Sequence, residues 1–401
     1  MKKILFVTDR NILTTSGELR LIKNRAESLY RENGIVTDFV VVSKKERIVN
    51  KTETIVAGGN IVSYEMSVRH PYISISSHKS VIQDIKTRLA KKDYGAVILS
   101  GFAMPVYAKT IKQVSHIPVL LDIHGASEDM LELAKSSSKQ KGMMLQTLYH
   151  IDQKITKHSL NNIDGFFVVT ESLREYFKAR YSIDDNRPFF IVPCATNGEE
   201  FNREKYLKDR KKYRGKYHID KDEVVFIYSG GISPWQCVSE TIELYIKIAN
   251  FVERKTRLLV FSHNKDAIIK MADGDERIQI DSYSPDELAH ALSAGDYAFL
   301  LRANNITNNV AFPNKFLEYV QSGMRIITTP YVKEIAKQVK ENNLGFIYDF
   351  NMNLEPLLAD IQECGLSENR EECINAVLKY NSFSVTTRNF VEWYEARSYK
   401  S

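Results

Sequence analysis

Two cations beside a predicted helix start give the segment 302–318 the chemistry of an anion site. The apolar run 297–301 predicts a buried strand that ends directly before Arg302. Proline fits the first turn of a helix, so Pro313 predicts that a helix begins there, with Lys315 in its first turn. Free N–H groups and the helix dipole favour an anion at such a terminus, and the two cations add charge. The predicted ligand is a phosphate or a diphosphate.

Three further polar residues, Asn308, Asn314 and Glu318, belong to the same stretch. A bound anion would repel Glu318, so its carboxylate is assigned to neutral hydroxyls such as those of a ribose or a sugar. A structural alternative stays open. In it the helix is an ordinary amphipathic one, with Phe316 on its core face and Lys315 and Glu318 as a surface pair.

This stretch resembles a signature of GT-B glycosyltransferases of family four, the retaining enzymes that use nucleotide-sugar donors. The residues that carry the resemblance are Leu300-Leu301-Arg302, Asn308, Phe312-Pro313-Asn314-Lys315-Phe316 and Glu318-Tyr319. In that family the second of two glutamates spaced eight apart binds the donor, and Glu318 matches it. The first would stand at Val310, which leaves the role of that carboxylate open.

The length and composition of the chain restrict the kind of protein it can be. The chain has 401 residues, enough for two domains, with 43% hydrophobic and 26% charged residues, as in folded globular proteins. The start, MKKILFVTD, has too short an apolar run for a signal peptide and reads as a strand. No stretch approaches the roughly 18 apolar residues of a membrane span. Four cysteines without metal-type spacing indicate reduced thiols, so we expect a cytoplasmic protein.

The net charge of +5 is unevenly distributed. Residues 1–200 hold 28 Lys and Arg against 22 Asp and Glu, and the remainder holds 27 against 28. A basic half can meet anionic lipid or a polyanionic acceptor, although solvated faces are the commoner explanation. The segment 139–158 is both basic and amphipathic, and we interpret it as a core-packed helix. Peripheral contact with an anionic membrane at its inner face stays open, and nucleic acid is not expected.

Alternation of apolar runs with helical patterns predicts an α/β fold with parallel sheets. Strands are expected at 4–7, 37–42, 96–99, 119–122, 165–169, 224–228, 258–261, 277–280 and 297–301, and helices at 18–32, 80–91, 144–160, 202–217 and 382–398. The resemblance implies two Rossmann-like domains whose sheets face a central cleft, with the chain crossing between them at 191–201, where Pro193 and Asn197-Gly198 also predict a turn. The expected domains are 1–198 on the acceptor side and 199–381 for the nucleotide sugar, with the helix in 382–401 packing back on the first.

Ligands of parallel sheets bind beyond the carboxyl ends of strands, which directs attention to two loops of the first domain. One contains a glycine before a helix, and the other a histidine directly after a strand, where a carboxylate can set its tautomer. An ordinary turn and a structural histidine are the alternatives. The second loop resembles the family's Asp-x-His-Gly element, which implies that His124 lies near the transferred sugar. The acceptor-side candidates are Ser16, Gly17, Arg20, Asp122, Gly125 and Glu128.

In the second domain, Gly230-Gly231 between a strand and a helix permits close approach of a phosphate to the backbone. The family's Lys-Gly pair at this loop would fall at Gln236-Cys237, so Arg302 and Lys315 must carry more of the charge. The resemblance also brings the loop at Ser282 and Tyr283 to the base, largely through backbone. The donor-binding candidates are Gly230, Gly231, Ser233, Ser282, Tyr283, Asn308, Pro313 and Asn314.

Asp273-Gly274-Asp275 has the carboxylate spacing of the GT-A metal motif, but Asp-Gly is common in polar turns for conformational reasons. We therefore expect no metal and no cofactor beyond the nucleotide-diphosphate sugar itself.

The resulting hypothesis is a retaining, metal-independent, hexosyltransferase-like glycosyltransferase. Its donor is a nucleotide sugar and its acceptor a glycan, lipid-linked or polymer molecule, as in polysaccharide and cell-envelope biosynthesis. The residues expected to be catalytic are His124, Arg302, Lys315 and Glu318. Two alternatives remain, a GT-B-like nucleotide-sugar epimerase and a non-catalytic nucleotide-sugar-binding partner protein. The second is motivated by Val310 and Gln236 at two positions where the family has other residues.

Overall fold

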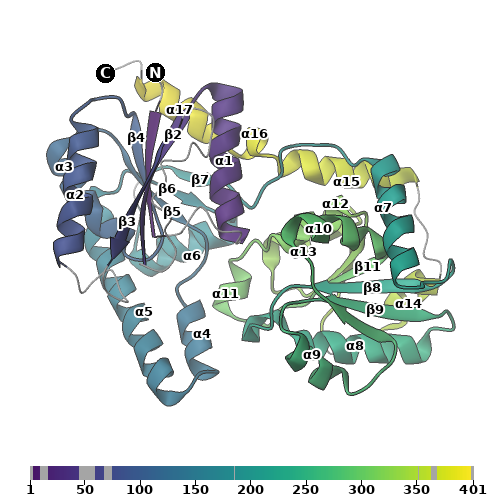
Figure 1. Ribbon diagram of the computed structural model, residues 1–401. Coiled ribbons are helices and arrows are strands. Elements are labelled where there is room, and N and C mark those ends of the chain that lie inside the picture. Colours follow the sequence, from purple (N-terminus) through teal and green to yellow (C-terminus); the bar gives the residue numbers. More distant parts are fainter. Residues whose placement is uncertain are drawn as a thin grey trace. The chain divides into compact units, whose positions relative to one another are not determined.

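The computed structural model describes residues 3–9, 17–44, 59–66, 75–184, 186–350, 352–362 and 368–398. The chain divides into two compact units (Figure 1). The N-terminal unit comprises Met1–Asn197 and Asn381–Ser401, and the C-terminal unit comprises Gly198–Tyr380. The α/β architecture with parallel sheets predicted from the sequence is confirmed.

Seven described strands form the sheet of the N-terminal unit, in the order β3-β2-β1-β4-β5-β6-β7, and all their pairings are parallel. They are β1 (Lys3–Thr8), β2 (Val36–Lys44), β3 (Ile61–Met66), β4 (Ala96–Ser100), β5 (Val119–Ile123), β6 (Gly165–Val168) and β7 (Phe189–Ile191). Strands such as β4 are buried at every position because helices cover both faces of the sheet. The strand order reverses between β1 and β4.

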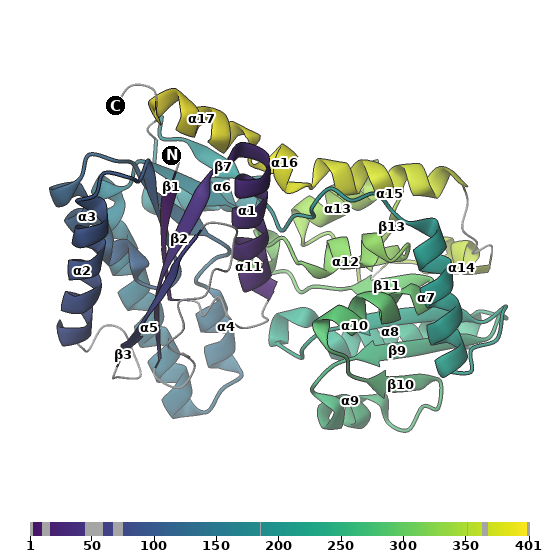
Figure 2. The same ribbon diagram turned by 45° about the horizontal axis from the view of Figure 1, so that its top comes forward.

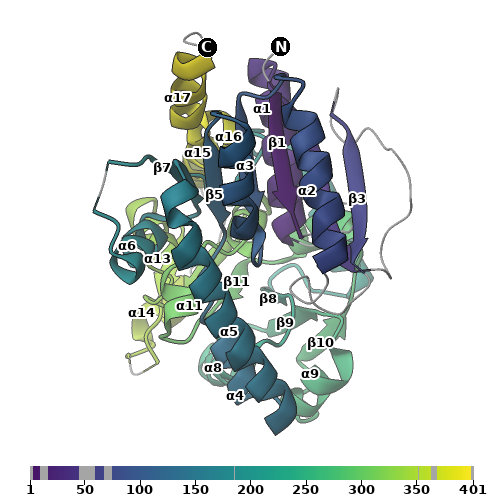
Figure 3. The ribbon, with the colours of Figure 1, turned by 90° about the vertical axis from the view of Figure 1, so that its left-hand side faces the viewer.

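The helices of this unit are α1 (Gly17–Asn33), α2 (Ile75–Leu89), α3 (Ala108–Val114), α4 (Asp129–Lys135), α5 (Lys139–Ser159), α6 (Glu171–Tyr181), α16 (Phe383–Thr386) and α17 (Arg388–Ser398). In Figures 1 and 2, α2 and α3 cover one face of the sheet, and α1 and α17 lie on the other. Figure 1 shows α4 and α5 side by side as a hairpin, and in the view of Figure 3 one lies in front of the other. The last helix belongs to this unit, since Phe390 packs against Phe167 (ring centroids 4.8 Å apart) and the Tyr394 hydroxyl donates to the Lys3 carbonyl (3.0 Å).

In the C-terminal unit, six described strands form a parallel sheet in the order β10-β9-β8-β11-β12-β13. They are β8 (Val224–Ser229), β9 (Thr256–Phe261), β10 (Ile278–Asp281), β11 (Tyr297–Leu300), β12 (Arg325–Thr328) and β13 (Gly345–Ile347). The helices are α7 (Arg203–Lys216), α8 (Val238–Phe251), α9 (Lys265–Ala272), α10 (Pro285–Ala291), α11 (Ile306–Asn309), α12 (Lys315–Gln321), α13 (Lys333–Glu341), α14 (Glu355–Gln362) and α15 (Glu368–Tyr380). The strand order reverses between β8 and β11.

Some predicted boundaries are wrong. The helix expected to begin at Pro313 begins at Lys315, and Asn314 is the residue that flanks its N-terminus. The closing helix expected over 382–398 is two helices. They separate at Thr387, whose hydroxyl donates to the Phe383 carbonyl (2.6 Å) and so competes with the backbone ladder. Within the described residues, no helix combines the length and the apolar character needed to cross a membrane.

Candidate functional site

The carboxyl ends of β8 and β11 lie next to each other where the strand order of the C-terminal sheet reverses. Ligands of parallel sheets bind at such points. Gly230 follows β8, and Arg302 follows β11 after one further residue. Gly230 has a φ of 128°, and a Cβ atom there would come within 2.2 Å of the Lys315 Nζ atom. The backbone conformation therefore favours glycine at this position, and a larger residue would also displace the Lys315 ammonium group.

Arg302 and Lys315 form a pair of cations without a carboxylate partner in the described part of the chain. The Arg302 side chain is 5% exposed, and its guanidinium donates to the Leu301 carbonyl (3.2 Å). Burial lowers the pKa of Arg302. Burial also lowers the pKa of Lys315 well below its ordinary value, the charge of Arg302 lowers it further, and Glu318 opposes this shift. An anion between these groups would relieve both the desolvation and the repulsion.

Three residues that the sequence analysis did not assign hold this pair in place. The Lys315 Nζ atom donates to Gln236 Oε1 (2.6 Å) and lies 4.5 Å from the centre of the Tyr228 ring. The Tyr228 hydroxyl donates to the same Gln236 oxygen (2.7 Å). The Tyr319 hydroxyl accepts from the backbone N–H of Ser229 (3.0 Å) and so ties α12 to the end of β8. Gln236 had drawn attention only as the position where the family's lysine is missing.

Asn308 connects the two loops of the donor half. Its side chain is 1% exposed, and its Nδ2 donates to the carbonyls of Trp235 (3.2 Å) and Ala303 (2.9 Å). In this arrangement Asn308 positions the Gly230–Gln236 loop against the loop after β11.

The remaining predicted donor residues lie in loops of the same unit. Ser233 precedes the 3₁₀ turn Pro234–Gln236, and its carbonyl accepts from the Gln236 N–H (2.8 Å). Pro313 and Asn314 precede α12, where their carbonyls accept from Phe316 and Glu318, and the Asn314 side chain makes no capping hydrogen bond. Because α12 has only seven residues, its dipole contributes little, and the two cations supply most of the positive potential.

The loop after β10 contains Ser282 and Tyr283, and much of its polar capacity is already engaged. The Ser282 N–H donates to Asp281 Oδ1 (2.8 Å). The Tyr283 side chain is 8% exposed, and its hydroxyl bonds to the Tyr217 hydroxyl and accepts from Lys216 Nζ (2.7 Å). Burial alone would raise the pKa of Asp281, but hydrogen bonds from Ser282, Lys216 and Tyr217 lower it to about 2. The Asp281 carboxylate therefore stays charged and holds the loop in place by accepting these hydrogen bonds.

The N-terminal unit contains a buried triad that orients His124. Asp122, at the end of β5, accepts two hydrogen bonds from Arg25 of α1, at 3.0 and 2.7 Å, and its Oδ2 lies 2.8 Å from His124 Nε2. Burial alone would raise the pKa of Asp122, but Arg25 and His124 hold it well below its ordinary range. The charged carboxylate fixes Nε2 of His124 as a donor, so Nδ1 is the nitrogen left to accept.

Sequence analysis missed Arg25, although the pattern contains a signal for it. Leu21, Ile22, Arg25, Ala26 and Leu29 follow helical spacing, and all five are buried, with Arg25 3% exposed. An arginine on the buried face of a helix needs a carboxylate. Asp122, at the end of a predicted strand, was the available partner.

Of the other predicted acceptor-side residues, Glu128 is engaged by tyrosines rather than by His124, and Gly125 directly follows His124 in the chain. Glu128 is 9% exposed and accepts from the hydroxyls of Tyr149 (3.0 Å) and Tyr176, which join the start of α4 to α5 and α6. A Cβ atom on Gly125 would meet nothing within 4 Å, so packing does not require glycine there. Gly17 and Arg20 lie in the first turns of α1, and Ser16 lies outside the described residues.

A search of the described residues finds no group of three His, Cys, Asp or Glu that could hold a metal ion. Asp273 ends α9 in the left-handed conformation (φ 46°), and Asp275 accepts from both the backbone and the guanidinium of Arg277. The Asp-Gly-Asp sequence therefore forms a self-contained turn.

Two doubly wound parallel-sheet units define the GT-B glycosyltransferase fold, which confirms the predicted resemblance at the level of the fold. No protein-family model matches the chain, and no curated protein matches its sequence. Among solved structures, the chain is similar to sucrose-phosphate synthase from Thermosynechococcus elongatus (TM-score 0.71, 13% identity, 100% of both chains covered). It is also similar to a glycosyltransferase from Rickettsia africae ESF-5 (TM-score 0.68, 14% identity, covering 100% of this chain and 99% of that one). A third is Anabaena HepE in complex with UDP and glucose (TM-score 0.63, 12% identity, covering 98% and 99%).

Proposed function

We propose that this protein is a glycosyltransferase that takes its sugar from a nucleotide-diphosphate sugar. The observation that carries this proposal is the pair of cations formed by the buried Arg302 and the partly buried Lys315, which lack a carboxylate partner among the described residues and adjoin the Gly230 loop. The negative charge of a diphosphate would neutralise this pair of cations. Similarity to a structure described as a complex with UDP and glucose supports the same donor class.

The proposed chemistry relies on stabilising the departing diphosphate. Charge that develops on the leaving group is best stabilised by fixed donors in a water-poor site, and Arg302, Lys315 and the backbone at Gly230 are such donors. Glu318 accepts hydrogen bonds from hydroxyls of the nucleotide sugar, and Nδ1 of His124 accepts one from a hydroxyl on the acceptor side. No side-chain nucleophile is assigned. On the resemblance to family four we propose retention of configuration, with the leaving phosphate taking the acceptor proton, and no metal requirement.

We further propose that the acceptor is a glycan, lipid-linked or polymer molecule and that the N-terminal unit contacts an anionic membrane surface. The start of α5 supports the second point. Met143 and Met144, which a core-packed helix would bury, are 53% and 44% exposed beside the exposed Lys139 and Lys141. Exposed apolar side chains flanked by lysines suit a membrane interface. Sedimentation with anionic but not with zwitterionic vesicles, lost in a Met143→Ser, Met144→Ser protein, would agree with this contact.

The function is tested by donor binding followed by transfer. Nucleoside diphosphates should raise the melting temperature by mass action, and Arg302→Ala or Lys315→Ala should remove most of that shift. Lys340→Ala, on the exposed side of α13, is the matched control and should behave as the parent. If both site variants respond like the control, the diphosphate binds elsewhere.

Turnover separates the proposal from its alternatives. Mass spectrometry of products with and without added acceptor distinguishes transfer from epimerisation, because an epimerase changes its nucleotide sugar without an acceptor. Donor binding without turnover across a broad acceptor panel would favour a non-catalytic binding protein.

A further inference from the structure

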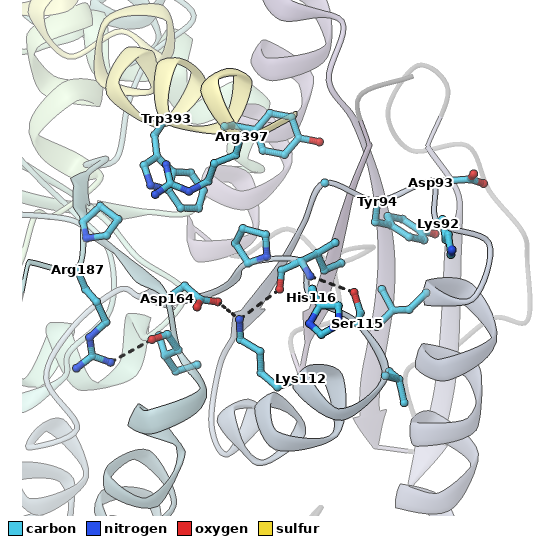
Figure 4. Close-up of a pocket in the computed structure, with 18 of the residues that line it drawn as sticks. Lys92, Asp93, Tyr94, Lys112, Ser115, His116, Asp164, Arg187, Trp393 and Arg397 are labelled. Carbon is cyan, nitrogen blue, oxygen red and sulfur yellow. Dashed lines mark hydrogen bonds and ion pairs between the residues drawn. The ribbon is translucent and has the colours of Figure 1, made fainter. Parts of the chain in front are cut away.

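The N-terminal unit contains a cavity of about 1320 Å³ at the edge of its sheet where the strands begin (Figure 4). Its walls are the segments that lead into β4, β5, β6 and β7, together with α17. His124, by contrast, follows the carboxyl end of β5. A five-residue strand is about 16 Å long, so the cavity and the His124 loop lie at opposite edges of one sheet. This cavity therefore does not belong to the site described above.

Four cations and two carboxylates line the cavity, which gives it a surplus of positive charge. Two of the cations serve the fold. Lys112, in the last turn of α3, pairs with Asp164 (2.6 Å), and Arg187 donates to the carbonyls of Leu160 (2.7 Å) and Ile163 (3.1 Å). These contacts satisfy the carboxylate and the two carbonyls that lie just before β6, so neither cation needs a ligand.

The other two cations, Lys92 and Arg397, have no carboxylate partner in the described ranges of the chain. Both are exposed, and the Arg397 guanidinium lies 4.4 Å from the centre of the Trp393 ring. The indole Nε1 of Trp393 is buried and finds no hydrogen-bond partner among the described residues. A buried donor without a partner is costly, so turning the indole toward an acceptor on a ligand would stabilise this wall. His116 also lines the cavity.

The size and the apolar walls of the cavity indicate the kind of ligand. Its volume exceeds the roughly 300–1,000 Å³ of most small-molecule pockets, which favours an extended ligand. Tyr94 and Tyr394 are buried behind the lining, with their hydroxyls engaged by Asp38 (2.6 Å) and by the Lys3 carbonyl (3.0 Å). The partly exposed Trp393 supplies aromatic surface to the cavity. Aromatic surface interleaved with hydrogen-bond donors suits sugar rings, and the uncompensated cations suit acidic substituents on them.

We infer that this cavity is a second saccharide site, which holds an anionic segment of a glycan at the edge of the sheet opposite His124. The saccharide class rests on the proposed function, whereas the preference for negative charge rests on the lining alone. An extended acceptor held here would remain attached to the N-terminal unit between successive transfers.

The test compares two double variants that remove the same charge. Lys92→Gln, Arg397→Gln alters the cavity, whereas Lys91→Gln, Arg388→Gln alters one neighbouring position and one position on the same helix, both exposed and both outside the cavity lining. Binding of a uronate hexasaccharide is measured by isothermal titration calorimetry without nucleotide, beside neutral maltohexaose and inorganic phosphate. We expect the hexasaccharide to bind about tenfold more weakly to the cavity variant and unchanged to the control variant, with little binding of maltohexaose.

Four results would overturn the inference. They are equal loss in both double variants, equal affinity for the neutral hexasaccharide, absence of hexasaccharide binding by the parent, and complete displacement by inorganic phosphate at the same concentration. Trp393→Phe keeps an aromatic ring but removes the indole N–H, and it should weaken binding of the hexasaccharide. Because no nucleotide is present, these results do not depend on whether the protein transfers sugar. The donor site is tested separately, by the melting-temperature shifts that nucleoside diphosphates cause in Arg302→Ala and Lys315→Ala.

Discussion

Replacing Lys315 with methionine should separate the contribution of its charge to binding from its effect on stability. Methionine keeps an unbranched apolar chain and removes the ammonium group. The Lys315 Nζ atom donates to Gln236 Oε1 (2.6 Å), and the Tyr228 hydroxyl donates to the same oxygen (2.7 Å). The single proton of the Tyr228 hydroxyl is also directed at the Gly231 carbonyl (2.5 Å), but Gln236 is only partly buried, so water can satisfy its oxygen in the variant. The substitution therefore removes one charge without leaving a fully buried acceptor unsatisfied.

Stability should rise in this variant. Burial and the charge of Arg302 lower the pKa of Lys315, so the unfolded chain holds this proton more tightly than the folded protein does. The free energy of unfolding of the parent consequently increases with pH between the lowered pKa and the ordinary lysine value of about 10.4. Below that window the buried charge is destabilising. Its removal should add about 1 kcal/mol, which corresponds to about 2–4 °C in melting temperature for a domain of this size.

Binding of a nucleoside diphosphate should weaken at the same time. One charge-assisted hydrogen bond contributes about 1.5–3 kcal/mol, so the dissociation constant should rise about 10- to 150-fold. In the parent, the bound anion raises the pKa of Lys315. Binding therefore takes up a proton at pH values between the free and bound pKa, and affinity falls as the pH rises through that window. The methionine variant should lose this proton uptake.

Isothermal titration calorimetry in two buffers of different ionisation enthalpy measures affinity and proton uptake together, and thermal unfolding gives the stability change. Lys340→Met, on an exposed position of α13, is the matched control. A Lys315→Met protein that binds UDP, ADP and GDP with the affinities and proton uptake of the parent would refute the anion-site assignment. A lower melting temperature would contradict the argument from burial.

Three further predictions concern both units. Glu318→Gln should reduce donor affinity or turnover at least about tenfold, because it removes a charged acceptor of donor hydroxyls, and steady-state kinetics equal to those of the parent would instead indicate a surface pair with Lys315. Arg25→Met should lower the free energy of unfolding by about 3–5 kcal/mol in urea, because it leaves Asp122 charged and buried with only His124 as partner, and an Arg25→Met, Asp122→Asn protein should recover part of the loss. Activity should survive chelation and the Asp273→Asn, Asp275→Asn change, since Asp275 is engaged by Arg277, and a strict requirement for manganese or magnesium would contradict this.

The fold class could be predicted because strands buried on both faces are nearly continuous apolar runs. The residues of β1, β4, β5 and β8 form such runs, and each was located within one or two residues. Four strands were missed. β7 and β13 have three residues each, too few to establish a period, and β3 and β12 contain polar residues.

The candidate site could be predicted only where one short segment holds the chemistry. Arg302, Lys315 and Glu318 lie close in sequence, so their types and spacing were informative. Gln236 contacts Lys315 across 79 positions, and Arg25 contacts Asp122 across 97. No local pattern specifies such pairs. Such pairs form only because the topology of the sheet brings the ends of particular strands next to each other.

The N-terminal unit is completed by residues that the ribosome adds only after those of the C-terminal unit. Phe390 of α17 packs between Phe167 (4.8 Å) and Phe190 (5.4 Å), after the whole C-terminal unit has been synthesised. A nascent chain arrested at Tyr380 therefore has every residue of the C-terminal unit, while the sheet of the other unit still lacks the aromatic cover of β6 and β7. Exposed aromatic surface on an unfinished domain is where chaperones bind and aggregation starts. Completion of the N-terminal unit thus waits for the synthesis of α17.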